Sequence, residues 1–133
     1  DEGLNIKHDI SVPVSLIPQF VAETDALLQS KIPGIRLVNF GHLGDGNLHY
    51  NVQAPPGADG PAFLRDHEDE VNTWVFDQVQ AFNGSISAEH GIGSLKADKL
   101  THHKDPTALA MMKAIKQALD PQNIMNPGRV IKI

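Results

Sequence analysis

The stretch GHLGDGNLHY, residues 41–50, joins two segments that both have the composition of β-strands. Its Asp45-Gly46 pair is a strong signal for a two-residue hairpin loop, because both positions of such a loop must tolerate a positive φ. With the loop at these two residues, His42 lies directly opposite His49 on the neighbouring strand. Opposed side chains have Cβ atoms about 4.5–5.5 Å apart, close enough for two imidazoles to share one metal ion. We therefore predict a hairpin whose register pairs the two histidines, and a slip of one residue would separate them.

A second segment, SISAEHGIG at residues 85–93, supplies the carboxylate that two histidines lack. It resembles a short strand that runs into a glycine-rich turn, and it carries Glu89 and His90 side by side. Two histidines and one carboxylate are a ligand set for a divalent ion with open positions, such as catalytic zinc or non-haem iron. The alternative is that the histidines end their strands and Glu89 is a solvated turn residue. We favour a site, because the histidines are in hairpin register and a glycine follows the Glu-His pair.

Composition narrows the class of protein. A chain of 133 residues with 41% hydrophobic residues is the size of one ordinary domain with a core. The net charge is −5 and the 11 lysines and arginines are scattered, which argues against a nucleic-acid surface. Cysteine is absent, so a metal would be held by nitrogen and oxygen. Without a transmembrane run or a signal-peptide pattern, we expect a cytoplasmic location, the inner side of a membrane, or mitochondria in a eukaryote.

Hydrophobic periodicity and turn residues predict the order strand, helix, strand, strand, helix, strand, helix, helix. The hairpin requires antiparallel pairing, so we predict an α+β fold with an antiparallel sheet and helices packed on one face. Ser15 is predicted near the N-cap of the first helix, and Gly84 in the left-handed position after the second. The predicted strands are 7–13, 35–42, 48–52 and 85–88, and the predicted helices span 15–32, 61–82, from about 94, and 106–119.

Three motifs, in this order along the chain, resemble the FAD-linked oxidases. They are GHLGDGNLH at residues 41–49, SAEHGIG at 87–93 and NPG at 126–128, and the segment KHDISVP at 7–13 is similar to the Lys-x-Asp strand of that family. The resemblance is to the C-terminal substrate domain of a group that includes D-lactate dehydrogenase, the FAD subunit of glycolate oxidase and D-2-hydroxyglutarate dehydrogenase. It spans nearly the whole chain and implies a ferredoxin-like or related antiparallel sheet covered by helices.

The resemblance implies a metal centre beside a base. His42, His49 and Glu89 resemble the metal ligands of the metal-dependent members, which are described with zinc or manganese. His90 resembles the base that takes a proton from the substrate hydroxyl, a role suited to histidine at neutral pH. The implied reaction oxidises a D-2-hydroxy acid to a 2-oxo acid, with the α-hydrogen leaving as hydride for the flavin and the metal orienting the substrate.

Substrate and cofactor positions are also implied. Lys7 and Asn51 resemble substrate-binding positions, and Lys7 could neutralise a substrate carboxylate. The predicted register independently places Asn51 on the face of the two histidines. Asn126 either approaches the flavin or only shapes the C-terminal turn.

In this family FAD is bound mainly by an N-terminal domain, and the sequence contains neither a dinucleotide-binding nor a phosphate-loop motif. We therefore expect residues 1–133 to be a fragment, the C-terminal substrate- and metal-binding domain without its FAD-binding domain. Its expected partners are a small 2-hydroxy acid and the N-terminal FAD domain of the same full-length chain, with no nucleic acid. The electron acceptor stays open, and a homo-oligomer is compatible with the sequence. The competing hypotheses are a self-contained metal-dependent hydrolase using the same ligands, and a small-molecule binding module without redox activity.

Overall fold

A computed structural model of the chain describes residues 4–133. The chain divides into two compact units, a first unit that extends to His90 and a second unit over Gly91–Ile133. Each unit has its own secondary structure, and each is described by itself below. None of the helices in residues 4–133 is both long and apolar enough to span a lipid bilayer.

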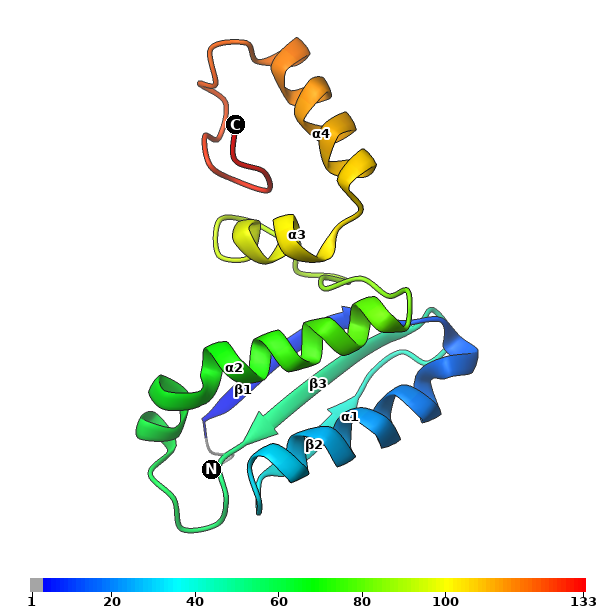
Figure 1. Ribbon diagram of the computed structural model, residues 1–133, viewed down its shortest axis with the longest axis vertical. Coiled ribbons are helices and arrows are strands. Elements are labelled where there is room, and N and C mark those ends of the chain that lie inside the picture. Colours follow the sequence, from blue (N-terminus) through cyan, green and yellow to red (C-terminus); the bar gives the residue numbers. More distant parts are fainter. Residues whose placement is uncertain (1–3) are drawn as a thin grey trace. The chain divides into compact units, whose positions relative to one another are not determined.

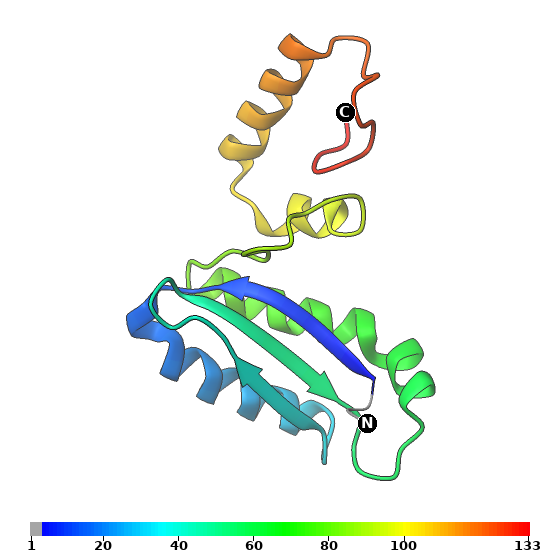
Figure 2. The same ribbon diagram turned by 180° about the vertical axis from the view of Figure 1, so that it is seen from behind.

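The first unit is a three-stranded antiparallel sheet with two long helices on one face. Its strands are β1 (Asn5–Ser11), β2 (Arg36–Phe40) and β3 (Asn47–Gln53), in the order β1-β3-β2. Helices α1 (Ile17–Lys31) and α2 (Gly60–Ala81) lie side by side over the same face, in front of the sheet in Figure 1 and behind it in Figure 2. This arrangement confirms the predicted α+β class.

The fourth predicted strand, 85–88, is reduced to a single antiparallel bridge between Ser11 and Ser85. Two backbone hydrogen bonds form this bridge, of 3.0 Å and 2.8 Å between the amide and carbonyl groups of the two residues. Ser85 therefore lies beside β1, on the edge away from β2. This is the edge that the last strand of a ferredoxin-like β-α-β-β-α-β unit occupies.

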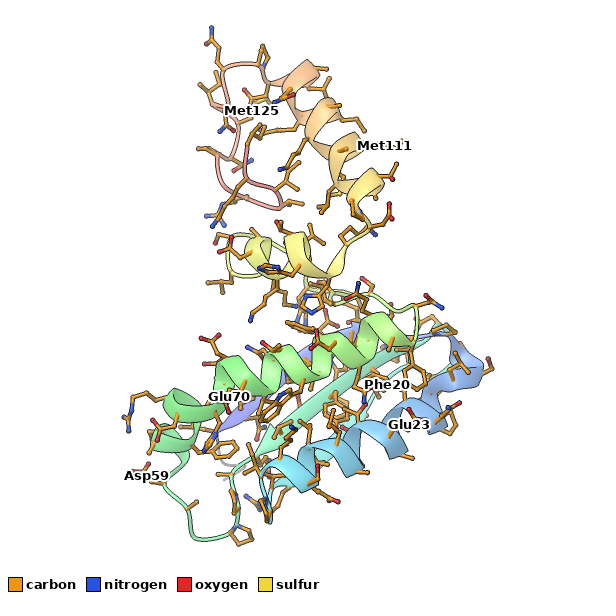
Figure 3. The ribbon with its side chains drawn as sticks, in the orientation of Figure 1. Phe20, Glu23, Asp59, Glu70, Met111 and Met125 are labelled. Carbon is orange, nitrogen blue, oxygen red and sulfur yellow. The ribbon has the colours of Figure 1, made fainter. Side chains whose placement is uncertain are left out.

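The core lies between the sheet and the two helices. Side chains of a strand alternate between faces, and Leu48, Tyr50 and Val52 of β3 are buried on the helix side. Phe20 of α1, labelled in Figure 3, packs edge-on against the Tyr50 ring. The Tyr50 hydroxyl donates to Asp25 at 2.7 Å, and burial together with this bond raises the pKa of the Tyr50 phenol above its ordinary value.

A buried histidine ties α2 to the sheet. The His8 ring has its Nδ1 2.8 Å from the carbonyl oxygen of Tyr50 and its Nε2 2.8 Å from the side-chain amide of Asn72 on α2. Phe76, one turn further along α2, meets the same ring edge-on. His8 is therefore part of the core, directly beneath the strand positions that the sequence assigns to the site.

Two helix boundaries differ from their predictions. Ser15 is not an N-cap, because a 3₁₀ turn over Val14–Leu16 precedes α1 and Leu16 occupies the cap position. At the end of α2 the left-handed residue is Asn83, with φ +55°, rather than Gly84. The Gly84 amide instead donates to the carbonyl of Val79, five residues earlier, at 2.8 Å. This is the 6→1 hydrogen bond of a Schellman motif. A Cβ on Gly84 would lie 2.2 Å from the carbonyl oxygen of Ser11, so a different constraint requires glycine there.

The predicted hairpin register is wrong by two residues. Phe40, and not His42, lies opposite His49, and the connection runs over residues 41–46. The ladder ends at Phe40, and the next residue, Gly41, approaches the start of β3 so closely that a Cβ on it would lie 2.2 Å from the carbonyl oxygen of Asn47. A shift of two residues preserves which face each side chain occupies, so His49 keeps its predicted face although its pairing with His42 is lost.

Gly46 makes a tertiary contact with Val12 of the segment after β1 and does not close a two-residue turn. Its φ is +82°, and its carbonyl accepts a hydrogen bond of 3.1 Å from the Val12 amide. A Cβ at this position would lie 2.4 Å from the Val12 carbonyl oxygen. The end of β1 and the hairpin connection are thus held together at a point that only glycine fits.

We expect Gly46→Ala to destabilise the first unit by at least about 1–3 kcal/mol, because alanine combines an unfavourable positive φ with the clash at Val12. Gly44→Ala is the matched control, because a Cβ there meets nothing within 4 Å. Urea unfolding followed by the fluorescence of Trp74, the one tryptophan and a residue of α2, reports on this unit. Equal stability of the two variants would contradict the assigned contact.

The second unit consists of α3 (Ala97–His103), α4 (Pro106–Leu119) and a C-terminal segment without helix or strand. Asp105 caps α4 by accepting from the Ala108 amide at 3.0 Å, with Pro106 in the first turn. At the other end, the Asp120 carboxylate accepts from the amides of Ile124 and Met125 and pairs with Lys116. These contacts hold the pKa of the Asp120 carboxyl below its ordinary value, chiefly through Lys116.

Candidate functional site

The face of the sheet away from α1 and α2, here called the open face, carries the predicted site residues of β1 and β3. Within residues 4–90 no helix covers it, as the view in Figure 2 shows. Lys7 and Asp9 of β1 alternate with His8, and His49 and Asn51 of β3 alternate with Tyr50. On the open face Asp9 and Asn51 are themselves buried, whereas Lys7 is exposed. Along β1 and β3 the open face is therefore polar, whereas on β2 it carries the exposed apolar side chains of Val38 and Phe40, opposite Asn51 and His49.

Strand pairing arranges these residues in two adjacent rows. Lys7 lies opposite Asn51, and Asp9 lies opposite His49. Directly opposed residues bring their Cβ atoms within about 4.5–5.5 Å, so each pair can contact one bound group. Both positions predicted to bind substrate thus form one row, next to a row that contains a predicted metal ligand.

Asp9 belongs to the site, and sequence reasoning missed it. Its carboxylate Oδ2 accepts from the backbone amides of Glu89 at 2.8 Å and His90 at 2.7 Å. Its main-chain carbonyl accepts from the Ala88 amide at 3.1 Å. The available signal was its position two residues after Lys7 in a predicted strand, which places both on one face.

The Glu89 side chain lies close to residues of the hairpin connection, of β3 and of β1. Its Oε1 lies 3.4 Å from Nδ1 of His42 and accepts from the side-chain amide of Asn47 at 3.1 Å. Asp9, His49 and Glu89 each offer one ligand atom, and these atoms all lie within 4.8 Å of one another. The hairpin connection, rather than cross-strand pairing, therefore brings His42 to Glu89. The group of three ligand atoms contains Asp9 in place of the predicted His42.

Asp9, His49 and Glu89 form a group that could hold a metal ion. Two ligands of a tetrahedral zinc, at about 2.0–2.1 Å from it, lie about 3.3–3.4 Å apart. The His42–Glu89 separation of 3.4 Å matches that spacing. The carboxylate ligand atoms of Asp9 and Glu89 lie within 4.8 Å of each other. Two negative charges at this distance repel, so a cation between them would be favourable. Imidazole and carboxylate donors suit zinc or manganese.

His90 lies at the rim of the cluster. Its Nδ1 is 3.7 Å from Oδ2 of Asp9, its ring centroid is 6.0 Å from that of His49, and its side chain is 68% exposed. The imidazole is thus accessible to a small molecule on the open face. On the other side of His49, the Phe40 ring lies against the imidazole with centroids 5.0 Å apart.

Asn126 belongs to the second unit, where its φ is +49° and its carbonyl accepts from the Arg129 amide at 3.3 Å. These contacts give it a part in shaping the C-terminal turn. A contact between Asn126 and the flavin stays a prediction.

Comparison with known proteins identifies the family. The model of the family described as "FAD linked oxidases, C-terminal domain" matches residues 1–130. The chain belongs to this family. The C-terminal-domain assignment accounts for the combination of motifs at 41–49, 87–93 and 126–128, all of which fall within the match.

Relatives of this FAD-linked oxidase domain include D-2-hydroxyglutarate dehydrogenases. Those of Stutzerimonas stutzeri (strain A1501) and Xanthomonas citri pv. viticola are 47% and 43% identical, over 93% and 95% of the chain. The mitochondrial D-2-hydroxyglutarate dehydrogenase of Bos taurus is 35% identical over 98% of the chain. The aligned region is only 26%, 26% and 22% of these relatives, so the chain corresponds to about a quarter of their length.

Proposed function

We propose that this chain is the substrate-binding part of an FAD-dependent dehydrogenase that oxidises a D-2-hydroxy acid, specifically D-2-hydroxyglutarate, to the 2-oxo acid. The observation that carries the proposal is the pair of rows on the open face, with Lys7 and Asn51 beside Asp9 and His49. The names of the relatives support the choice of substrate. They are dehydrogenases, which favours redox chemistry over the hydrolase and the non-redox binding module.

Lys7 and Asn51 are proposed to hold the substrate at its carboxylate end. An ammonium group attracts a carboxylate as a point charge, and the Asn51 amide adds a donor and an acceptor that fix orientation. The rows are two residues apart along the strands, about 7 Å. A five-carbon dicarboxylate can therefore contact Lys7 while its hydroxyl carbon lies near the second row.

His42, His49 and Glu89 are the residues proposed to hold a zinc or manganese ion. When bound, such an ion supplies Lewis acidity that lowers the pKa of the substrate hydroxyl. The charge balance of the site supports this assignment, because Asp9 and Glu89 together would otherwise repel an anionic substrate.

His90 is proposed to accept the hydroxyl proton as the alcohol becomes a ketone. The C–H electron pair of the substrate leaves with its hydrogen as hydride, for which FAD, when bound, supplies the acceptor. The substrate thus loses one hydride and one proton, and the proton goes to the imidazole of His90. Asn126 is proposed to approach the flavin from the second unit.

The flavin-binding part is proposed to be an N-terminal domain of the same full-length protein. Met111, Ile115 and Leu119 are one helical turn apart along α4 and are 61%, 58% and 76% exposed (Met111 is labelled in Figure 3). Exposed apolar residues on one face of a helix are typical of a surface that packs against another domain. We propose that the flavin-binding domain covers this face of α4.

The proposed function is tested by anaerobic reduction of the flavin in the full-length protein. D-2-hydroxyglutarate is expected to bleach the flavin absorbance stoichiometrically, with 2-oxoglutarate as product. The L-enantiomer and D-lactate serve as controls for configuration and chain length. Bleaching by D-lactate but not by D-2-hydroxyglutarate would retain the reaction class and reject the substrate, and no bleaching by either would reject the proposal.

Lys7→Met is expected to raise KM for D-2-hydroxyglutarate by about 10–100-fold, which corresponds to about 1.4–2.7 kcal/mol of lost carboxylate binding. The effect on kcat is expected to be smaller, because Lys7 lies a row away from the reacting groups. Initial rates against substrate concentration measure both constants. Lys7→Arg keeps the charge and is the control, and a fall in kcat at unchanged KM would contradict the assignment.

A further inference from the structure

We infer that Asp9 is a positioning residue whose carboxylate fixes the backbone of Glu89 and His90, so that their side chains project toward the metal site and the substrate respectively. The inference deepens the proposed function and rests on it for the roles of Glu89 and His90. The hydrogen bonds that carry it are independent of that function.

Three successive amides converge on this one residue. The Ala88 amide donates to the Asp9 carbonyl at 3.1 Å, and the Glu89 and His90 amides donate to its Oδ2 at 2.8 and 2.7 Å. Hydrogen bonds to an ionised acceptor are shorter and stronger than neutral ones, and these two lie in that range. Asp9 therefore fixes a tripeptide that is 79 to 81 residues away in sequence.

Regular sheet pairing does not extend to this tripeptide. The described β-bridge between the segment and β1 is confined to Ser11 and Ser85. Beyond it, the Asp9 carboxylate takes the place of a ladder partner for Glu89 and His90. Two neighbouring residues whose amides share one oxygen are held in a defined turn, and this restricts where their side chains project.

The burial of Asp9 also argues for a positioning role. Asp9 is only 4% exposed, and burying a carboxylate is unfavourable unless hydrogen bonds or a counter-charge compensate. An apolar residue opposite His49 would avoid that penalty. The carboxylate also faces two imidazoles, with Oδ1 3.9 Å from Nδ1 of His49 and Oδ2 3.7 Å from Nδ1 of His90. Carboxylates beside metal-binding histidines orient the rings and raise metal affinity.

The test combines amide NMR of the ¹⁵N-labelled chain with calorimetric titration of Zn²⁺ and Mn²⁺. In the wild type, we expect the Glu89 and His90 amide protons downfield of the random-coil range and slow to exchange. Asp9→Ala is expected to abolish both features and to weaken Zn²⁺ binding by about 10–100-fold. Asp9→Asn retains one oxygen that can accept both amides, so it is expected to keep part of the downfield shift and to weaken binding less.

Asp25→Asn is the matched control, because Asp25 also accepts a hydrogen bond, from Tyr50, but lies on α1 on the other face of the sheet. It is expected to leave the two amides and the Zn²⁺ affinity unchanged. Unchanged Glu89 and His90 amides in Asp9→Ala would overturn the inference. If the alanine variant does not fold, an Asp9→Asn variant with wild-type amide shifts would overturn it, and reduced shifts would support it.

Two further outcomes separate the inference from the proposed function. An Asp9→Asn variant that keeps its amide shifts but loses Zn²⁺ as completely as Glu89→Gln would make Asp9 a ligand, and would overturn the positioning role. A wild-type chain that binds neither ion would reject the proposed metal site. In that case the amide shifts alone decide the inference, and their loss in Asp9→Ala would still support it.

Discussion

Replacing His90 with alanine is expected to lower kcat for 2-hydroxy acid oxidation by about 10²–10⁴-fold, the usual contribution of a general base. The metal affinity of the chain is expected to stay nearly unchanged, because the His90 side chain is not a proposed metal ligand and the hydrogen bond from its backbone amide to Asp9 is retained in alanine. Stopped-flow reduction of the flavin in the full-length protein measures the first effect. Zn²⁺ titration of the chain measures the second.

Exposure of the His90 imidazole provides a sharper form of this test. The side chain is 68% exposed, so in His90→Ala a small base from solution can reach the space it leaves. Added imidazole is expected to restore part of the lost turnover, whereas His67→Ala, which changes α2 on the other face, is expected to need no rescue. Loss of Zn²⁺ binding in His90→Ala would instead exchange the roles proposed for His90 and Glu89.

The element order was predictable because local signals and tertiary packing agree over most of the first unit. The alternation of apolar residues in β3 and the Pro-Gly-rich stretch before α2 each require one local structure. The strand at 85–88 was overpredicted. Its composition favours a strand, but its backbone pairing with β1 is limited to the Ser11–Ser85 bridge and one hydrogen bond from Ala88 to the Asp9 carbonyl.

The predicted hairpin register was wrong because it depends on contacts between residues distant in sequence, which local turn propensities do not describe. Asp45-Gly46 has the sequence of a two-residue loop, but the positive φ of Gly46 serves a contact with Val12, which is distant in sequence. Gly41 is likewise required by its approach to Asn47. The sequence identified Gly46 as a turn residue but not the role of Gly41, and tertiary contacts decide which turn the connection forms.

In the candidate site, too, local sequence patterns predicted some features and tertiary contacts determined the others. The face shared by His49 and Asn51 followed from period-two alternation, which a two-residue slip does not change. Asp9 could not be found in this way, because its partners Glu89 and His90 are 80 and 81 residues away. A buried carboxylate is recognised by the amides that surround it, and these are known only from the fold.

Replacing His49 with alanine is expected to weaken Zn²⁺ binding by more than about 100-fold, since even outer partners of a metal ligand contribute about 10–100-fold. The reason is the proximity of His49 to Asp9 and Glu89, since one ligand atom of each of the three lies within 4.8 Å of the others. Elemental analysis of the purified chain and calorimetric titration with Zn²⁺ measure the change.

The fold is expected to survive His49→Ala, because His49 lies on the open face and the neighbouring Leu48 and Tyr50 supply the β3 contribution to the core. Trp74 fluorescence during urea unfolding checks this directly, since the tryptophan lies on α2. His67→Ala removes an imidazole from the other face and is expected to keep full metal binding. Unchanged metal stoichiometry in His49→Ala would remove His49 from the ligand set, and the cluster would then reduce to His42, Glu89 and the buried Asp9.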